Sequence, residues 1–225
     1  MGTGTFTYRD LGQQPYGEVL ALQESLFQQN LAAKEESRAT TNTLLLCEHN
    51  PVFTIGKTGK RENILVNTAN MQAELFHVQR GGDVTFHGPG QLVAYPIFDL
   101  DTLGMGVAEY INKLEGTILK TLLHYGIEGE RIHDAPGIWI RNRRIGLYTD
   151  NKICAIGARV SRHVTMHGLA ININTDLSYF QKIISCGLTG KGVTSLAQLV
   201  GHPVPMDEYK ILFLQKFAET FNLSN

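Results

Sequence analysis

Apolar residues recur along this chain in two rhythms, one typical of helices and one typical of strands. Steps of three and four residues predict amphipathic helices at residues 15–34 and 106–125. Pro15 suits a first helical position, and Gly126 suits the position just after a helix end. Asp207 is expected to start a last helix. The chain is therefore expected to carry one long helix near each end and a third in its middle.

Short apolar or alternating runs predict strands, four of them in succession after the middle helix. The expected strands are residues 43–48, 76–79, 92–98, 137–140, 144–148, 152–160 and 164–173. Short polar turns join the last four, which indicates an antiparallel meander. Thr175 or Asp176, and then Thr194 or Ser195, are expected to cap two short helices. Without a linker-like stretch or an internal repeat, residues 1–225 are expected to form one α/β domain.

Charge and cysteine content argue against several classes of protein. With 20 basic and 21 acidic residues, the formal net charge of -1 argues against a dedicated nucleic-acid binder. No apolar run is long enough to span a membrane, and the first residues lack a signal-peptide core. The cysteines show no metal-ligand spacing, and their odd number suits a reducing compartment. We therefore expect a cytoplasmic protein without a metal.

Residues 80–95, RGGDVTFHGPGQLVAY, gather four glycines and a proline around one aspartate and one histidine. Glycine permits positive φ and a close backbone approach to a ligand, and Pro89 fixes the turn after His87. Because strands are expected on both sides, this glycine-rich run is predicted to be a loop at strand ends. It would present His87 beside exposed backbone N–H groups. An ordinary hairpin loop rich in turn formers is the alternative.

The three cysteines occupy different kinds of sequence. Cys47 follows three leucines, and Cys154 alternates with apolar residues, so both are expected to be small core side chains. Cys186 lies in the glycine-rich stretch SCGLTGKG, where exposure and nearby backbone N–H groups would lower a thiol pKa. Cys186 is therefore the candidate nucleophile, and a partly buried loop cysteine is the alternative.

A nucleophilic thiol needs a base, for which Lys152 is the candidate. If residues 152–160 alternate regularly, Lys152 shares a mostly apolar face with Cys154, and desolvation would lower the pKa of its ammonium. The alternative is a strand-end lysine that reaches out to water. His167 shares a face with apolar residues such as Leu169, so it is either a hydrogen-bonded core histidine or a cleft residue.

Four segments together resemble the octanoyltransferase LipB family, also called lipoate-protein ligase B. They read RGGDVTFHGPGQLVAYP at 80–96, KICAIGAR at 152–159, HVTMHG at 163–168 and SCG at 185–187, and HNPVFTIG at 49–56 also fits. The matches run in order through residues 45–195, and their joint occurrence is far more specific than any one of them. The resemblance implies the catalytic fold of biotin and lipoate ligases, a mixed, largely antiparallel sheet flanked by helices.

What the resemblance implies is an acyltransferase that works through a covalent thioester. Cys186 would accept an octanoyl group from acyl carrier protein, with Lys152 as its dyad partner. The group would then pass to a lysine of a lipoyl domain, in 2-oxoacid dehydrogenase complexes or in the glycine cleavage H protein. A thioester is already activated, so neither ATP nor another cofactor is expected. The matching segments imply that the substrate-binding residues are Arg80, Gly81, Gly82, His87, Gly88, Ala155, Ile156, Gly157, His167, Gly168 and Ala170.

The same resemblance suggests roles for several of these residues. Backbone N–H groups around Gly81, Gly82 and Gly88, with His87, are expected to stabilise charge on the thioester oxygen. A side chain at Gly157 would block the acyl chain or the dyad. Because acyl carrier protein and lipoyl domains are typically acidic, a basic docking surface is also expected. The candidates are Arg141, Arg143, Arg144, Lys182 and Lys191, and a solvated hairpin turn is the alternative.

Two other functions compete with octanoyl transfer. The first is an ATP-dependent lipoate or biotin ligase, which would activate a free acid as an adenylate. The GKT at residues 56–58 superficially suggests a phosphate loop, but Pro51 stands where the first glycine of that motif is required. The second is a noncatalytic acyl-binding protein, which would have no use for Lys152 and Cys186. The sequence therefore favours thioester chemistry.

Overall fold

A computed structural model describes residues 4–66, 72–133, 135–144, 147–184 and 191–224. Its largest element is an eight-stranded sheet in the order β2-β3-β7-β11-β10-β9-β8, with β12 paired to β10. Most neighbours in this sheet are antiparallel, whereas β2–β3 and β10–β12 are parallel. Its strands are β2 (Thr7–Gln14), β3 (Thr43–His49), β7 (Gln91–Ile97), β8 (Glu130–Ile132), β9 (Ala135–Arg144), β10 (Leu147–Ser161), β11 (Val164–Asn172) and β12 (Gly192–Val193).

Two smaller sheets accompany the large one. The three-stranded sheet runs β5-β4-β6, and β1 pairs with β13 near the two ends of the chain. The bounds are β1 (Gly4–Thr5), β4 (Val52–Ile55), β5 (Glu74–His77), β6 (Val84–His87) and β13 (Leu223–Ser224). The 3-10 helices η1 (Arg61–Asn63) and η3 (Leu177–Lys182) lie beside the three-stranded sheet, joined by a bridge between Ile64 and Ile183.

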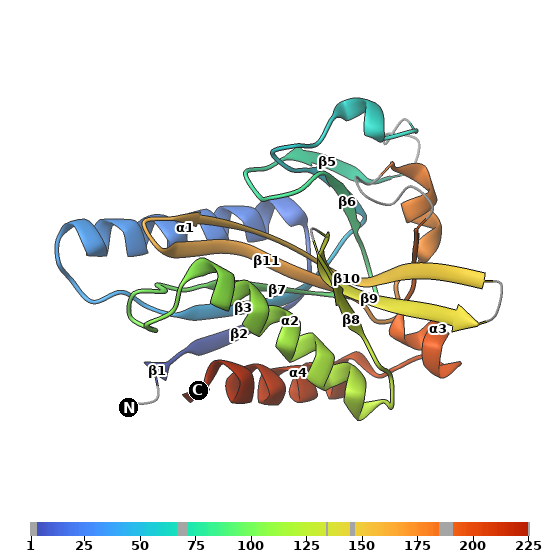
Figure 1. Ribbon diagram of the computed structural model, residues 1–225. Coiled ribbons are helices and arrows are strands. Elements are labelled where there is room, and N and C mark those ends of the chain that lie inside the picture. Colours follow the sequence, from blue (N-terminus) through green and yellow to red (C-terminus); the bar gives the residue numbers. More distant parts are fainter. Residues whose placement is uncertain (1–3, 67–71, 134, 145–146, 185–190, 225) are drawn as a thin grey trace.

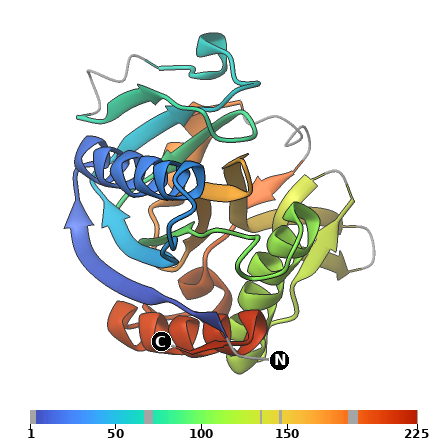
Figure 2. The ribbon, with the colours of Figure 1, turned by 90° about the vertical axis from the view of Figure 1, so that its left-hand side faces the viewer.

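Helices cover the large sheet from both sides. In Figures 1 and 2, α1 (Tyr16–Glu35) lies on one side, and α2 (Val107–His124) and α4 (Met206–Phe221) lie together on the other. The short α3 (Leu196–Val200) is capped by the side chain of the preceding residue, Ser195. The main apolar core lies between the sheet and the α2–α4 pair, and a second cluster lies beneath α1. This is the mixed, largely antiparallel sheet with flanking helices that the sequence predicts.

The expected helices are confirmed, with small shifts at their ends. α1 and α2 differ from the expected ranges by one residue at each end, and α4 begins at Met206, after Pro205, rather than at Asp207. Asp176 and Ser195 are the caps, in preference to their threonine neighbours. The buried side of α1 is not purely apolar, because it includes Gln23 and Asn30.

The strand predictions are correct in kind and wrong in several positions. β2 is missing from the prediction because its sequence, TYRDLGQQ, is polar and largely exposed. The glycine-rich run is not all loop, since β6 occupies Val84–His87 inside it. No separate strand covers residues 144–148, because β9 extends to Arg144 and β10 already begins at Leu147. A polar turn sequence and a polar strand sequence look alike when no core face marks the strand.

Candidate active site

A cavity of about 620 Å³ follows β10 from Lys152 to Val160 and is closed by the glycine-rich run and by residues of β7 and β11. This volume lies within the range of about 300–1,000 Å³ that is typical of small-molecule sites. The sequence-predicted residues that line it are Arg80, Gly81, Gly82, His87, Lys152, Ala155, Ile156, Gly157, His167, Gly168 and Ala170. Gly88 is not in the lining, and Cys186 lies outside the described residues.

Lys152 reaches the cavity because β10 carries a bulge just after it. Lys152 pairs with Trp139 and Cys154 pairs with Ile138, so Ile153 is an extra residue on β10. Adjacent residues of β9 point to opposite faces, and their partners on β10 do the same. The prediction that Lys152 and Cys154 share a face is therefore wrong, since one inserted residue reverses the alternation. Cys154 enters the apolar core instead.

The Lys152 ammonium is partly buried and shares the face of the Trp139 ring with a second ammonium, that of Lys191. Its Nζ donates to the Pro136 carbonyl oxygen at 3.3 Å and stands 4.6 Å from the centre of the Trp139 ring. Loss of hydration on burial lowers the pKa of Lys152; the Cys154 thiol opposes the shift, and the nearby Lys191 ammonium adds to it. A larger fraction of Lys152 is therefore neutral at a given pH than for a free lysine, as a proton acceptor requires.

Cys47 and Cys154 are poor nucleophiles. Both are fully buried, and burial raises the pKa of both thiols. Each therefore stays protonated at neutral pH, and the prediction that both are core side chains is confirmed.

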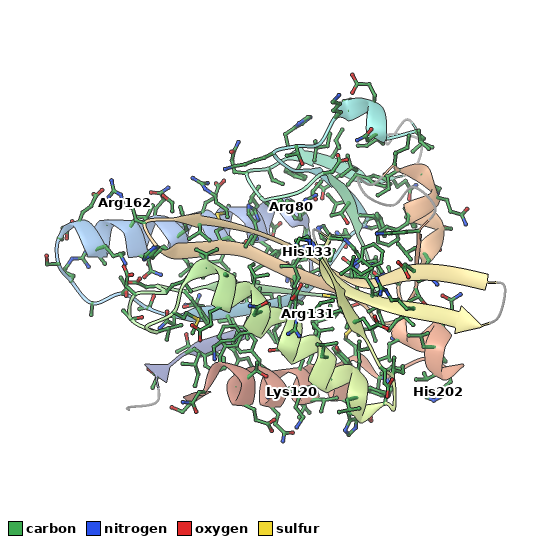
Figure 3. All side chains as sticks on the ribbon, viewed as in Figure 1. Arg80, Lys120, Arg131, His133, Arg162 and His202 are labelled. Atoms are coloured by element: carbon green, nitrogen blue, oxygen red, sulfur yellow. The ribbon has the colours of Figure 1, made fainter. Side chains whose placement is uncertain are left out.

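Arg80 organises the glycine-rich run rather than reaching for a ligand. Its guanidinium donates to the carbonyl oxygens of Gly81 (2.9 Å), Asp83 (2.6 Å) and Thr54 (2.8 Å), and also to the Thr54 hydroxyl. Figure 3 places Arg80 between the three-stranded sheet and the large sheet. One planar cation thus fixes the run against β4, which a lysine ammonium would do less well.

Gly157 is required by the backbone that packs on it. A Cβ at this position would lie 2.8 Å from the Gly81 carbonyl oxygen and 3.4 Å from the Arg80 side chain. The Gly81 N–H donates to the Ala158 carbonyl oxygen at 3.1 Å, so it is already occupied. Gly157 thus lets the glycine-rich run pair closely with β10, and Gly81 is a poor donor for an oxyanion.

Buried rings lie on the α1 side of the cavity, where Tyr16, His87 and Tyr95 line it and His49 packs behind them. His49 donates through Nδ1 to the Gln14 carbonyl oxygen (3.1 Å), and its Nε2 lies 2.8 Å from the Tyr95 hydroxyl. Tyr16 stacks against His87, with ring centres 6.0 Å apart and planes 7° apart. Burial, the largest cause, lowers the pKa of His49 to about 4 and that of His87 to about 3. Both rings are therefore neutral at physiological pH.

His167 is a cavity residue with unusual backbone geometry. Its φ is 59°, inside strand β11, and its backbone N–H donates to Gln23 Oε1 at 3.2 Å. Burial, with the neighbouring Arg80 and Arg159 cations, lowers its pKa to about 3. Of the two alternatives that the sequence leaves open, the cavity position is the one observed. Its Nδ1 is buried without a hydrogen-bond partner among the described residues.

Several residues that shape this site are not predicted from the sequence. Tyr16 is the first residue of α1, and Trp139 is a buried strand residue whose ring lies under two lysines. Gln91 and Asn172 are buried amides at strand ends. A polar amide at the end of an otherwise apolar strand is the signal that was available for both, because buried amides need partners.

The predicted docking arginines are only partly described. Arg141 forms ion pairs with Glu130 (3.1 Å) and Asp150 (3.4 Å), so its charge is already matched. Arg143 and Arg144 lie near the end of β9, where the structure describes the backbone only. A different basic group, Lys57, Lys60 and Arg61, is exposed beside the cavity residue Thr58.

The fold, a largely antiparallel sheet flanked by helices, is that of the catalytic domains of lipoate and biotin protein ligases. The family model described as "Lipoyl protein ligase A/B catalytic domain" matches residues 15–218, and the chain belongs to that family. Relatives within it carry the name octanoyltransferase. The one from Parabacteroides distasonis is 45% identical, over 96% of this chain and 99% of its own. The one from Bacteroides thetaiotaomicron is 47% identical, over 87% of this chain and 86% of its own.

Solved structures support the fold at low sequence identity. A chain from an archaeal lipoylation system, "a bi-partite lipoate protein ligase and its E2 lipoyl domain from Thermoplasma acidophilum", superposes with a TM-score of 0.68 at 16% identity, covering 100% of this chain and 86% of that one. Lipoate-protein ligase A bound with ATP gives 0.67 at 16% identity, covering 99% and 87%. These likenesses establish the ligase-type fold.

None of the helices that the structure describes is long and apolar enough to cross a membrane. Nor do three His, Cys, Asp or Glu side chains gather into a metal-binding group anywhere in the described ranges.

Proposed function

We propose that residues 1–225 form one catalytic domain that transfers an octanoyl group from acyl carrier protein to a lysine of a lipoyl domain. The observation that carries this proposal is the partly buried Lys152, with its lowered pKa, in the lining of a cavity of small-molecule size in a chain 45% identical to an octanoyltransferase. The acceptors are lipoyl domains of 2-oxoacid dehydrogenase complexes and the glycine cleavage H protein. The reaction is the first step of endogenous protein lipoylation and takes place in the cytoplasm.

Cys186 is the thiol that carries the acyl group. The other two cysteines are fully buried with raised pKa values, which leaves Cys186 as the thiol suited to attack. Val193 follows Cys186 by seven positions and pairs with Lys152 in the sheet. A chain of that length spans at most about 25 Å, so the connection limits the separation of the two proposed dyad members to about that distance.

The chemistry proceeds in two displacements at one carbonyl carbon. Neutral Lys152 takes the Cys186 proton, the thiolate attacks the thioester, and the carrier thiol leaves with that proton. In the second displacement the acceptor amine attacks, its proton passes to Lys152, and the Cys186 thiolate leaves. The backbone N–H group of Gly82 is the candidate for holding oxyanion charge, because Gly82 lines the cavity and its N–H has no backbone acceptor among the described residues.

The competing function is that of an ATP-dependent ligase, because one structural neighbour of the same fold is a lipoate-protein ligase A bound with ATP. The two activities are separated by supplying the octanoyl group in two forms to one lipoyl domain. We expect transfer from octanoyl-acyl carrier protein without ATP, and none from free octanoate with ATP and magnesium. Transfer that requires the free acid and ATP would contradict the proposal. In both reactions, mass spectrometry of the lipoyl domain shows whether the octanoyl group has been added.

The acidic carrier and acceptor domains dock on the exposed cations beside the cavity. The exposed cations are Lys57, Lys60 and Arg61. A few residues further on, the Leu65 N–H donates to the Lys182 carbonyl oxygen, which places Lys182 in a segment that runs beside this part of the chain. Lys57 itself donates its N–H to the Arg80 carbonyl oxygen at 3.0 Å, so this surface adjoins the glycine-rich run. The charge complementarity raises the rate of encounter more than the affinity.

A further inference from the structure

His87 is held by a chain of hydrogen bonds whose directions are fixed by backbone carbonyls. Asn172 Nδ2 donates to the Thr194 carbonyl oxygen at 3.0 Å. Gln91 Nε2 donates to the Phe86 carbonyl oxygen at 3.2 Å and to Asn172 Oδ1 at 2.8 Å. A carbonyl oxygen only accepts, so flipping either amide would set oxygen against oxygen. Gln91 Oε1 is therefore the atom that faces His87 Nδ1, at 2.7 Å.

This direction decides which ring nitrogen of His87 carries the proton. Because Gln91 Oε1 can only accept, Nδ1 must donate, and the neutral ring then has a bare lone pair at Nε2. His87 is 6% exposed and lines the cavity, and Nε2 meets no protein donor among the described residues. The cavity thus contains a hydrogen-bond acceptor at Nε2, supplied by a ring that stays neutral.

The same hydrogen bonds reach the strand that carries Lys152. The Thr194 peptide accepts from Asn172 at its oxygen, and its N–H donates to the Lys152 carbonyl oxygen at 3.0 Å. The preceding residue, Val193, pairs with Lys152 in the sheet. One connected set of bonds therefore fixes the His87 ring and the Lys152 main chain relative to one another.

A hydrogen-bond acceptor at His87 Nε2 suits the amine of the acceptor lysine but not the thioester carbonyl. A thioester carbonyl oxygen only accepts, so Nε2 cannot stabilise it, and the expectation that His87 helps to hold oxyanion charge does not fit this tautomer. A primary amine brings two N–H bonds. As the C–N bond forms and the C–S bond breaks, one amine proton passes to Lys152 and the other stays on the new amide nitrogen. Cys186 leaves as the thiolate.

We infer that His87 Nε2 accepts the N–H that the acceptor lysine keeps, and that Gln91 and Asn172 are positioning residues which fix this tautomer. The inference rests on the proposed octanoyl transfer and adds the group that orients the amine lone pair towards the carbonyl carbon. It predicts that the two half-reactions depend differently on Gln91. Acylation of Cys186 involves no amine, whereas transfer to the lipoyl domain does.

The tautomer is measured directly in the wild-type protein. Long-range proton–nitrogen NMR of the labelled ring distinguishes the nitrogen that carries hydrogen from the one that does not. We expect Nδ1–H and unprotonated Nε2 between about pH 5 and pH 8. A ring protonated at Nε2 and bare at Nδ1 would overturn the inference, and this arm needs no variant.

The role is tested by Gln91→Glu, with Gln28→Glu, an exposed change of the same kind on α1, as the matched control. A carboxylate beside Nδ1 favours the doubly protonated ring, which turns Nε2 into a donor. Its second oxygen replaces the Gln91 donor to the Phe86 carbonyl oxygen and Asn172 Oδ1, so both half-reactions are compared at equal folded fraction, measured by thermal unfolding. We expect transfer from the acylated enzyme to the lipoyl domain to slow about tenfold, with acylation of Cys186 within about twofold of wild type. Equal slowing of both steps would reject the role. A wild-type enzyme that never acylates Cys186 would refute the proposed function instead, while the NMR result would still report the tautomer.

Discussion

Two buried regions lie on opposite sides of the large sheet, and among the described residues only the one on the α1 side adds a directed hydrogen bond between buried rings to its apolar packing. Between the sheet and the α2–α4 pair, aromatic rings such as Phe98, Phe217 and Phe221 pack against one another without directional bonds. On the α1 side, His49 and His87 are fixed by hydrogen bonds of defined direction. Packing of the first kind stabilises a fold, whereas bonds of the second kind hold particular atoms in place beside a cavity.

Strand β10 contributes to both the cavity and the apolar core. Lys152 and Cys154 are only two positions apart on it, but Lys152 faces the cavity and Cys154 faces the core. Replacing Lys152 with Met should lower octanoyl transfer by about a thousandfold, because the proton acceptor is lost. Thermal unfolding should change little. Lys120→Met, on the exposed side of α2 (Figure 3), is the control and should retain full activity. Activity within about tenfold of wild type in Lys152→Met would exclude Lys152 as the base.

The apolar region should respond in stability rather than in chemistry. Phe217 is fully buried and contacts Phe6, Phe98, Phe213 and Phe221. Phe217→Ala should lower the free energy of unfolding by about 3–5 kcal/mol, measured by urea denaturation. Transfer per folded molecule should be unchanged. If catalysis by the folded fraction falls as well, the two regions are coupled.

The Arg80 clamp should affect both properties. Arg80→Met removes donors from three carbonyl oxygens of the glycine-rich run and β4, so we expect a loss of about 2–3 kcal/mol in unfolding free energy. Octanoyl transfer should fall too, because the glycine-rich run that borders the cavity is then no longer fixed against β4. Arg38→Met, at an exposed arginine, is the control. Unfolding and activity indistinguishable from wild type would rule out the clamp.

Acid should weaken the polar region before it affects the apolar one. The pKa values of His49 and His87 are about 4 and 3 in the folded protein, below the value of about 6.5 for an unfolded histidine. The unfolded chain therefore binds more protons in this window, so stability is complete above about pH 6.5 and declines as pH falls. Because each of the two rings takes up one proton on unfolding, urea titrations should show a decline of about 2–3 kcal/mol per pH unit down to about pH 4. A flat profile would show that these rings are not buried neutral.

The smallest effect is expected at the surface. Changing Lys57 and Lys60 to Glu should raise the Michaelis constant for octanoyl-acyl carrier protein about threefold to tenfold at low salt, with little change in kcat. Added salt should shrink the difference, because screening acts on exposed charges. Lys120→Glu provides the same charge reversal away from the cavity. An equal response in both variants would remove this docking surface.

The fold follows from periodicity wherever one face of an element is buried. α2 alternates clearly between core and solvent, so its range is predicted to within one residue at each end. β2 is mostly exposed, and β6 lies inside a run of turn formers, so neither leaves an apolar pattern in the sequence. An element is therefore predictable from the sequence when one of its faces is buried, because only then do its apolar residues recur with a helix or strand period.

The site shows the same limit at finer scale. Arg80, Gly157 and His167 are predicted from the motif segments, and all three line the cavity. The segments do not predict two contacts that the structure shows, the bonds from Arg80 to backbone carbonyl oxygens and the approach of the Gly81 carbonyl oxygen to Gly157. The bulge after Lys152 depends on pairing with β9, a strand many positions away, so alternation along β10 alone predicts the wrong face.

The measurement that tests the central proposal most directly follows the acyl group itself. The protein is incubated with octanoyl-acyl carrier protein without ATP, digested, and examined for the octanoyl mass on each cysteine peptide. We predict the label on Cys186, and its disappearance, with matching gain on the lipoyl-domain lysine, when that domain is added. A label on Cys47 or Cys154, a label that does not move, or a strict need for ATP would contradict the account.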